Sequence, residues 1–212
     1  MKLYTYFRSS AAYRVRIALG VKGISYQSAF VHLRDGEHLK PGFREVNPHG
    51  LVPVLEDEGR TLTQSLAIIE YLEEAHPEPP LLPHSPADRA TVRSMALAIA
   101  CEIHPLNNLR VLNYLRGTLG LDENGVNAWY RHWIAAGLQG LEEQAKHTSA
   151  DGRYLFGSSV TLADVCLVPQ MYNARRFNCD LEPYPTLRAI DAHLQTLPAF
   201  AAAAPEAQPD AQ

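Results

Sequence analysis

Residues 3–19 of the chain read LYTYFRSSAAYRVRIAL. The first five residues predict a strand, and from Ala11 onward apolar residues recur at helical spacing, so Arg8, Ser9 and Ser10 lie where a helix begins. The first amides of a helix lack internal partners, and the helix dipole places partial positive charge there. We therefore predict an anion site at this corner, which becomes an active site if the anion is a thiolate.

Length and composition are typical of a globular chain with one large or two small domains. The 212 residues are 46% hydrophobic and carry a formal net charge of −4. No long basic run indicates nucleic-acid binding, and no apolar stretch approaches the roughly 18 residues that span a bilayer. The N-terminus lacks a secretory signal pattern. We therefore expect a cytoplasmic protein with no nucleic-acid or membrane partner.

The cysteines and histidines give no support for a metal or a disulfide framework. Cys101, Cys166 and Cys179 are an odd number and widely spaced, so we expect buried, inert thiols. The nine histidines show no paired spacing typical of metal ligands. We predict no metal.

Strand and helix patterns alternate in residues 1–80. We expect strands at residues 3–7, 25–31, 52–56 and 60–63, with helices after Ser10 and Ser65, in the order βαβ and then ββα. Residues 32–47 leave room for one short helix. The pattern predicts an α/β domain with a mixed sheet.

A proline-rich stretch separates this domain from a second one. Five of the eleven residues from 76 to 86 are proline, which favours an extended connector, and we place the linker at residues 81–86. Residues 87–200 show helical spacing and no convincing strand, so the second domain is predicted to be all-helical. Residues 201–212 contain little large apolar side chain, and we expect a mobile tail there.

Two dipeptides of the first domain are candidate binding features. Pro53 stands at the head of a strand, where a trans proline is ordinary; a cis Val52-Pro53 bond would instead turn the main chain of Val52 outward to pair with an extended peptide. Ser65 is a good helix N-cap. If Ser65 does not cap the helix, its hydroxyl, the free helix amides and the neighbouring Gln64 would instead bind a carboxylate.

A good helix of the second domain is interrupted at residues 102–110, which read EIHPLNNLR. Proline costs about 3 kcal/mol in a helix interior, and such breaks often mark functional sites. A kink at Pro105 would direct His104, Asn108 and Arg110 toward a site. The alternative is a simple boundary between two helices.

Several polar residues have a structural interpretation. Thr161 and Asp164 have the spacing of a capping box, so we assign them to folding. Arg14 and Arg16 point to different faces of the first helix, and we interpret both as structural or surface residues. Arg176 ends a helix, where a cation suits the dipole for structural reasons alone.

Together these segments resemble the glutathione-site segments of the zeta class of glutathione transferases. The resemblance extends over nearly the whole chain and implies a thioredoxin-like N-terminal domain, a helical C-terminal domain and a homodimer. The chain departs from the common pattern at Ala11, where a cysteine often follows the serine pair, so side reactions at that cysteine are not expected. The matching segments are Ser9-Ser10, RVRIAL at 14–19, Asn47-Pro48, Val52-Pro53 and QSLAIIEYL at 64–72.

The resemblance implies glutathione as the cofactor. It places Gln64 and Ser65 at the γ-glutamyl end, Val52 at the cysteinyl main chain and His38 near the glycyl end. The full set that it assigns to glutathione binding is Ser10, His38, Val52, Gln64, Ser65, His104 and Asn108.

The glutathione sulfur would then lie at the opening corner. A helix N-terminus stabilises a thiolate by roughly 1–2 kcal/mol, which is about one pKa unit. A serine hydroxyl and the nearby guanidinium of Arg8 would lower the pKa further. Ser9 and Ser10 are both candidates for the donor, and Ser10 as a plain N-cap is the alternative for that residue.

Within the class, the chain most resembles the isomerases of maleyl keto acids in aromatic-acid breakdown. The implied reaction converts maleylpyruvate to fumarylpyruvate in gentisate catabolism. Arg8, Arg110 and Arg176 are our candidates for binding the substrate carboxylates, because the planar guanidinium fork suits them. The alternatives are a maleylacetoacetate isomerase, a general detoxifying transferase and a non-enzymatic interaction protein.

Overall fold

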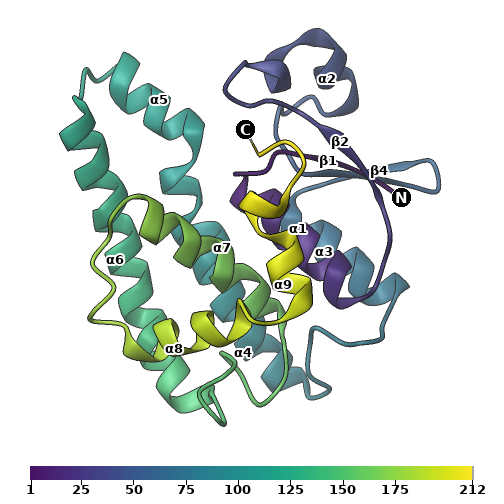
Figure 1. Cartoon of the computed structure of the whole chain (residues 1–212), viewed down its shortest axis with the longest axis vertical. Coiled ribbons are helices and arrows are strands. Elements are labelled where there is room, and N and C mark those ends of the chain that lie inside the picture. The colour runs from purple at the N-terminus through teal and green to yellow at the C-terminus, as the bar shows by residue number, and fades with distance from the viewer. Residues whose placement is uncertain (212) are drawn as a thin grey trace. The chain divides into compact units, whose positions relative to one another are not determined.

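The computed structural model describes residues 1–211, which divide into two compact units. The first unit contains Met1–Pro80 together with the chain from Thr196 onward, and the second contains Leu81–Gln195. Figure 1 shows the elements of both units.

The first unit contains a four-stranded mixed sheet in the order β2-β1-β3-β4. Strand β1 pairs parallel with β2 and antiparallel with β3, so Leu3 lies opposite both Ser28 and Leu55. A parallel pair needs a crossover, whereas the antiparallel pair β3–β4 needs only the turn at Glu58 and Gly59. The predicted order βαβ, then ββα, is confirmed. The strands are β1 (Lys2–Thr5), β2 (Gln27–Phe30), β3 (Val54–Asp57) and β4 (Arg60–Thr63).

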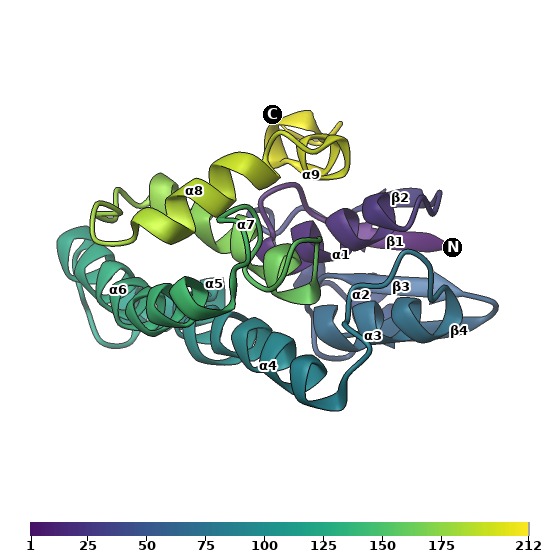
Figure 2. The same ribbon diagram turned by 90° about the horizontal axis from the view of Figure 1, so that it is seen from below.

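Helix α1 provides the crossover between the two parallel strands and is almost entirely buried. It packs against α3 and α9, and Figure 2 shows these neighbours from below. Val15, Ile17 and Leu19 are fully inaccessible to solvent, so α1 is a core element rather than a surface helix. The helices of this unit are α1 (Ser10–Val21), the 3-10 helix η1 (Glu37–Leu39), α2 (Pro41–Val46), α3 (Ser65–Ala75), α9 (Pro198–Ala203) and the 3-10 helix η4 (Pro205–Ala207).

The C-terminal residues differ from our prediction of a helical domain ending at residue 200 and a mobile tail after it. They return to the first unit, where Phe200 is fully buried. A Cβ atom added at Gly20 would lie 3.3 Å from Ala199 Cβ, so small residues let α9 approach α1 closely. The alanine-rich composition therefore permits close packing instead of preventing it. The tail prediction for Gln212 falls outside the described residues.

The second unit is helical, as predicted. Within the described chain its β-structure is limited to an isolated bridge between Ser149 and Gly157. Predicted linker residues Leu81 and Leu82 are buried, and Pro86 already belongs to a helix. The elements are α4 (Pro86–Leu97), the π-helix η2 (Ala98–Ile103), the 3-10 helix η3 (Pro105–Asn107), α5 (Leu109–Gly117), α6 (Glu123–Thr148), α7 (Leu162–Arg176) and α8 (Pro185–Leu194).

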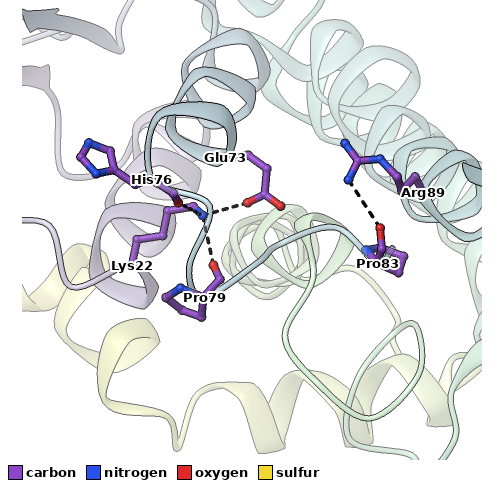
Figure 3. Close-up of polar contacts among 6 residues, drawn as sticks. All are labelled: Lys22, Glu73, His76, Pro79, Pro83 and Arg89. Atoms are coloured by element: carbon purple, nitrogen blue, oxygen red, sulfur yellow. Dashed lines mark hydrogen bonds and ion pairs between the residues drawn. The ribbon is translucent and has the colours of Figure 1, made fainter. Parts of the chain in front are cut away.

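Hydrogen bonds within each unit hold the proline-rich stretch of residues 76–86 (Figure 3). In the first unit, the buried Lys22 Nζ lies 2.8 Å from Glu73 Oε2 and donates to the Pro79 carbonyl at 3.0 Å. In the second unit, Arg89 donates to the Pro83 carbonyl at 3.4 Å. The proline-rich connector is therefore anchored on both sides.

The capping box at the start of α7 is confirmed as a folding element. Asp164 is buried and accepts hydrogen bonds from the Thr161 N–H at 2.8 Å and the Leu155 N–H at 2.7 Å. Burial raises the pKa of Asp164 to about 6 even though these donors favour its charged form. The box thus holds the preceding loop against the helix.

Candidate functional site

The corner between β1 and α1 forms as the sequence predicts. Ser9 is the N-cap of α1: its Oγ accepts the Ala12 N–H at 3.2 Å, and its own N–H donates to the Tyr6 carbonyl at 2.9 Å. The alternative that Ser10 caps the helix is wrong, because Ser10 is the first helical residue and is buried. A hydroxyl oxygen that accepts keeps its own proton, so Ser9 can still donate to an anion.

The positive end of α1 has no acidic residue of its own, since its first turn contains none. Arg8 immediately precedes the cap, and its guanidinium carbon lies 4.8 Å from the centroid of the Phe7 ring. Within residues 1–211, Arg8 forms no ion pair. An anion at this helix end would therefore meet a dipole, a hydroxyl and a guanidinium together.

The main chain at Val52 is available for pairing with a ligand. The Val52-Pro53 peptide bond is cis, which decides between the two predicted alternatives. Neither main-chain polar group of Val52 forms a hydrogen bond within the described residues. Its side chain is buried in a cluster with Phe7 and Val54. The unpaired N–H and C=O of Val52 are thus held in place by a buried side chain.

Close approach at Gly50 brings His38 to the loop that precedes Val52. Gly50 has φ +61°, and an added Cβ would lie 2.9 Å from the His38 carbonyl oxygen, so only glycine fits without rearrangement. The same loop is shaped by Asn47, whose side chain donates to the Leu51 carbonyl at 2.8 Å. The structure therefore places His38 and Val52 around one loop.

His38 carries an unsatisfied polar atom. Its Nδ1 is buried and has no hydrogen-bond partner within the described residues. Burial, and secondarily the charge of Arg44, lower the pKa of His38, so the imidazole stays neutral at neutral pH. A ligand that hydrogen-bonds Nδ1 would satisfy it.

Gln64 and Ser65 begin α3 in an unusual conformation. Gln64 has φ 68°, a left-handed conformation that costs a non-glycine residue on the order of 1–3 kcal/mol and is typical of ligand sites. Its side chain makes no capping hydrogen bond. The N-terminal amides of α3 are therefore not capped by this side chain, and the buried Ser65 follows directly. This arrangement suits a carboxylate.

Arg14 reaches the start of α3, a contact that the sequence did not reveal. Its side chain is 1% exposed, so the surface alternative is wrong, and Nη1 donates to Ser65 Oγ at 3.4 Å. A guanidinium beside Ser65 adds positive charge where α3 already presents its positive end. Helical spacing alone could not reveal this contact, because Ser65 lies on another helix.

The interrupted helix of the second unit is confirmed, and it divides into α4, the π-helix, a 3-10 turn at Pro105 and α5. The helix-boundary alternative describes this region: Asn108 caps α5 by accepting the Arg110 N–H at 3.2 Å. His104 lies at the junction and is half-buried. Both the π-helix and the cap therefore determine how this segment presents its side chains.

The π-helix packs closely against a glycine of α6. An added Cβ at Gly137 would lie 2.2 Å from Ile103 Cγ1, so Ile103 occupies the space that any larger residue would fill. After His104 in the chain, the Leu106 carbonyl accepts a hydrogen bond from Trp129 Nε1 at 2.8 Å. These two contacts fix the chain on either side of His104.

Arg176 lies at the end of α7 on an aromatic stack. The rings of Phe177 and Tyr130 are parallel at 3.5 Å, and the Arg176 guanidinium carbon lies 4.8 Å from the Phe177 centroid. Arg131 Nε donates to the Phe177 carbonyl at 2.8 Å. Burial raises the pKa of Tyr130 far above its ordinary value, so the phenol remains neutral. The exposed guanidinium of Arg176 is thus placed over a rigid neutral surface.

The predicted site residues therefore fall into two sets. The first unit holds the corner, the Val52 main chain, His38 and the α3 start; the second unit holds the interrupted helix and the end of α7. The first set is Arg8, Ser9, Ser10, His38, Val52, Gln64 and Ser65; the second is His104, Asn108, Arg110 and Arg176.

The prediction of buried cysteines holds only in part. Cys166 is buried as expected, whereas Cys101 is exposed and Cys179 is half-buried, so the prediction of buried thiols is wrong for Cys101. Burial raises the pKa of Cys179 to about 11. Among residues 1–211 no three metal-ligating side chains cluster.

Comparison with known proteins assigns the chain to a family. Residues 3–80 match the family described as glutathione S-transferase, N-terminal domain. A probable maleylacetoacetate isomerase of Vibrio cholerae is 56% identical over 211 residues, which cover 99% of this chain and 97% of that protein. The holo structure of a maleylpyruvate isomerase, a bacterial glutathione S-transferase in the zeta class, has a TM-score of 0.98 at 50% identity over 100% of both chains.

A third relative has been solved with two bound ligands. The maleylacetoacetate isomerase of Methylobacterium extorquens AM1, solved with bound malonate and glutathione, has a TM-score of 0.96 at 41% identity over 100% of both chains. A thioredoxin-like domain with a helical partner domain is the architecture of a glutathione S-transferase. The chain belongs to this family and, within it, to the zeta class of glutathione-dependent isomerases.

Proposed function

We propose that the protein converts maleylpyruvate to fumarylpyruvate by glutathione-dependent cis–trans isomerisation. The observation that carries this proposal is the start of α1, where Ser9 retains a hydroxyl proton, the first turn has no acidic residue and Arg8 has no carboxylate partner among the described residues. These groups favour a thiolate over a thiol. They suit a reaction in which the sulfur must be both a good nucleophile and a good leaving group.

Glutathione fits the polar groups of the first unit. The amide end of α3 at Gln64 and Ser65, with Arg14 beside it, suits the γ-glutamyl carboxylate. The unpaired main chain of Val52 suits the cysteinyl residue, and the unpartnered Nδ1 of His38 suits the glycyl end. Ser10, His104 and Asn108 complete the proposed glutathione-binding set.

The chemistry divides between cofactor and protein. Glutathione, when bound, supplies the thiolate that adds to the carbon–carbon double bond and departs after rotation about the resulting single bond. Ser9 donates its hydroxyl proton in a hydrogen bond to the sulfur, and the α1 amides hold the negative charge. Ala11 carries no sulfur, so the protein itself offers no competing thiol at this corner.

Arg8, Arg110 and Arg176 are the proposed ligands of the two substrate carboxylates. Each single alanine variant is expected to lower kcat/KM by about 10- to 150-fold, because one charge-assisted contact contributes about 1.5–3 kcal/mol. Arg188→Ala is the control, since Arg188 pairs with the exposed Glu182 on the surface. Steady-state kinetics with saturating glutathione measure the effect. Near-normal efficiency in all three variants would contradict the proposed carboxylate site.

Maleylacetoacetate is the second candidate substrate, favoured by the 56% identical Vibrio cholerae relative. Both acids present the same maleyl group and differ at the far end. A spectrophotometric assay of both acids, each with and without glutathione, decides between them: the higher kcat/KM identifies the substrate. Isomerisation that persists unchanged without the thiol would overturn the mechanism. Turnover of a chlorinated nitrobenzene without maleyl isomerisation would instead select a detoxifying transferase.

The proposal extends to a homodimer that acts in the cytoplasm in gentisate breakdown. Support for assembly comes from large apolar side chains exposed on the second unit, at Leu97, Leu109, Tyr114 and Leu119. Light scattering coupled to size exclusion tests the oligomeric state, and a monomer at assay concentration would contradict it. None of the helices that the structure describes is long and apolar enough to cross a membrane.

A further inference from the structure

A carboxylate near the end of the described chain contacts the main chain next to the proposed thiolate corner. Asp210 Oδ2 accepts the Phe7 N–H at 2.9 Å, although the two residues are 203 positions apart. Phe7 directly precedes Arg8. Asp210 is 8% exposed, and its Oδ1 accepts no hydrogen bond within the described residues. A buried carboxylate is costly unless it is engaged, so the Phe7 amide is its principal hydrogen-bonding partner.

The carbonyl of the same residue is held by a buried arginine. Arg16 Nη2 donates to the Phe7 carbonyl at 3.0 Å, Nη1 to Thr5 Oγ1 at 3.0 Å, and Nε to the Ala203 carbonyl at 3.1 Å. Burial lowers the pKa of Arg16 to about 10, and the charge of Asp210 is among those that oppose the shift. Both main-chain polar groups of Phe7 are therefore fixed by charged side chains, one of which comes from the C-terminal segment.

The orientation of Phe7 sets the position of the two groups that follow it. The Phe7 ring packs in the buried cluster and supports the Arg8 guanidinium at 4.8 Å. The Ser9 N–H donates to the Tyr6 carbonyl at 2.9 Å, so the chain turns tightly around Phe7 before α1 begins. A rotation of the Phe7 peptide would move Arg8 and the Ser9 hydroxyl together.

We propose that Asp210 is a positioning residue for the reaction: through the Phe7 N–H it holds the main chain that places Arg8 and Ser9 at the glutathione sulfur. This role rests on the proposed function. The start of α3 at Ser65, which is proposed to bind the γ-glutamyl carboxylate, takes no part in the hydrogen bonds of Asp210 or Arg16, so Asp210 should affect catalysis without affecting glutathione affinity.

The test compares two alanine variants that each remove a carboxylate bound to a main-chain amide. Asp210→Ala removes the contact to Phe7, and Asp122→Ala removes a matched contact at the start of α6, where Asp122 Oδ1 accepts the Gly125 N–H at 2.8 Å. For Asp210→Ala we expect kcat to fall about tenfold, since small displacements of reacting groups have effects of this size or larger. The apparent pKa of bound glutathione, followed by thiolate absorbance against pH, should rise, while its calorimetric Kd stays within about twofold of wild type. Asp122→Ala should leave all three unchanged.

A conservative variant separates the hydrogen bond from the charge. Asp210→Asn keeps a carbonyl oxygen as acceptor but removes the negative charge, so it should restore kcat and give a thiolate pKa no higher than that of wild type. If Asp210→Ala does not fold, Asp210→Ser replaces it, because the serine hydroxyl is one bond too short to reach Phe7. Unchanged kcat and thiolate pKa in the folded variant that lacks the contact would overturn the positioning role, as would an equal loss in Asp210→Asn. The assay of the wild-type protein alone tests the proposed function itself. Absence of glutathione-dependent turnover in that assay would overturn it.

Discussion

At the C-terminal end of α1, Lys22 Nζ lies 2.8 Å from Glu73 Oε2 and donates to the His76 carbonyl at 2.7 Å. Figure 3 shows this arrangement at the start of the linker. In the middle of the same helix, Arg16 is also buried, but its hydrogen bonds go to oxygens that carry no charge, the Ala203 carbonyl and the Thr5 hydroxyl before the helix. Both cations attach a segment distant in sequence to α1, one with a carboxylate partner and one without.

The two buried cations differ in whether their charge is neutralised by a partner. Lys22 and Glu73 neutralise each other, so the C-terminal end is a closed structural contact. Dipoles solvate the guanidinium of Arg16 without cancelling its charge, so positive potential persists near the α1 N-terminus. Asp210 reduces that potential while holding Phe7 in place. The contact at the C-terminal end of α1 is thus an ion pair, whereas Arg16 is held by neutral hydrogen-bond partners.

The largest expected effect is on stability, at the Lys22 end. Lys22→Met leaves the buried Glu73 carboxylate without its ammonium partner, which should lower the free energy of unfolding by about 3–5 kcal/mol. Arg116→Met is the control, because its partner Glu123 is exposed, and it should lose less than about 1 kcal/mol. Chemical denaturation followed by circular dichroism measures both. Equal losses would show that the Lys22 contact is no more structural than a surface pair.

An intermediate effect is expected at Arg16. Lysine keeps the charge but cannot reach Thr5, Phe7 and Ala203 together, so Arg16→Lys should lower the free energy of unfolding by roughly 2 kcal/mol and also lower kcat. Arg188→Lys on the exposed surface should change neither quantity. The measurements are denaturation and steady-state turnover of the folded fraction. Lost stability with unchanged kcat would reduce Arg16 to a purely structural cation, like Lys22.

The smallest effect on stability is expected at the two serine N-caps. Ser9 and Ser85 each accept a helix amide at 3.2 Å, so each alanine variant should cost about 1 kcal/mol of stability. Turnover should fall by at least about tenfold in Ser9→Ala alone, because the Ser9 hydroxyl is also the proposed hydrogen-bond donor to the thiolate. Thermal melting and turnover of both variants check this. A parallel loss of turnover in Ser85→Ala would remove the special role of the α1 cap.

Local patterns predicted the parts of the protein that depend on neighbouring residues in the chain. The corner at Ser9, the strand order, the start of α3 at Ser65 and the break at Pro105 all follow from periodicity, capping and backbone preference. Such signals extend over a few residues and need no partner from elsewhere. The proline-rich linker was also visible, although its outer residues Leu81 and Leu82 pack with the second unit.

Burial of polar residues was not predictable in the same way. Arg14 and Arg16 lie on different faces of a helix and were predicted to be structural or surface residues; the structure excludes the surface alternative, because they are 1% and 2% exposed. The reason is that α1 is covered from several directions, by α3 on one side and α9 on another. The prediction of a mobile tail was wrong for residues 201–211 for a similar reason: the Ala203 carbonyl accepts from Arg16 and Asp210 accepts the Phe7 N–H, contacts that the composition of the segment does not reveal.

The sequence by itself determined where the capped start of α1 would lie, which segments resemble a glutathione site, and that the chain divides at a proline-rich linker. Only the tertiary structure decided that Arg14 reaches Ser65, that His38 lies beside the loop before Val52, and that Asp210 contacts Phe7. The first group depends on backbone preferences and spacing, which are local. The second depends on contacts between residues far apart in the chain, and these exist only once the hydrophobic core has brought their elements together.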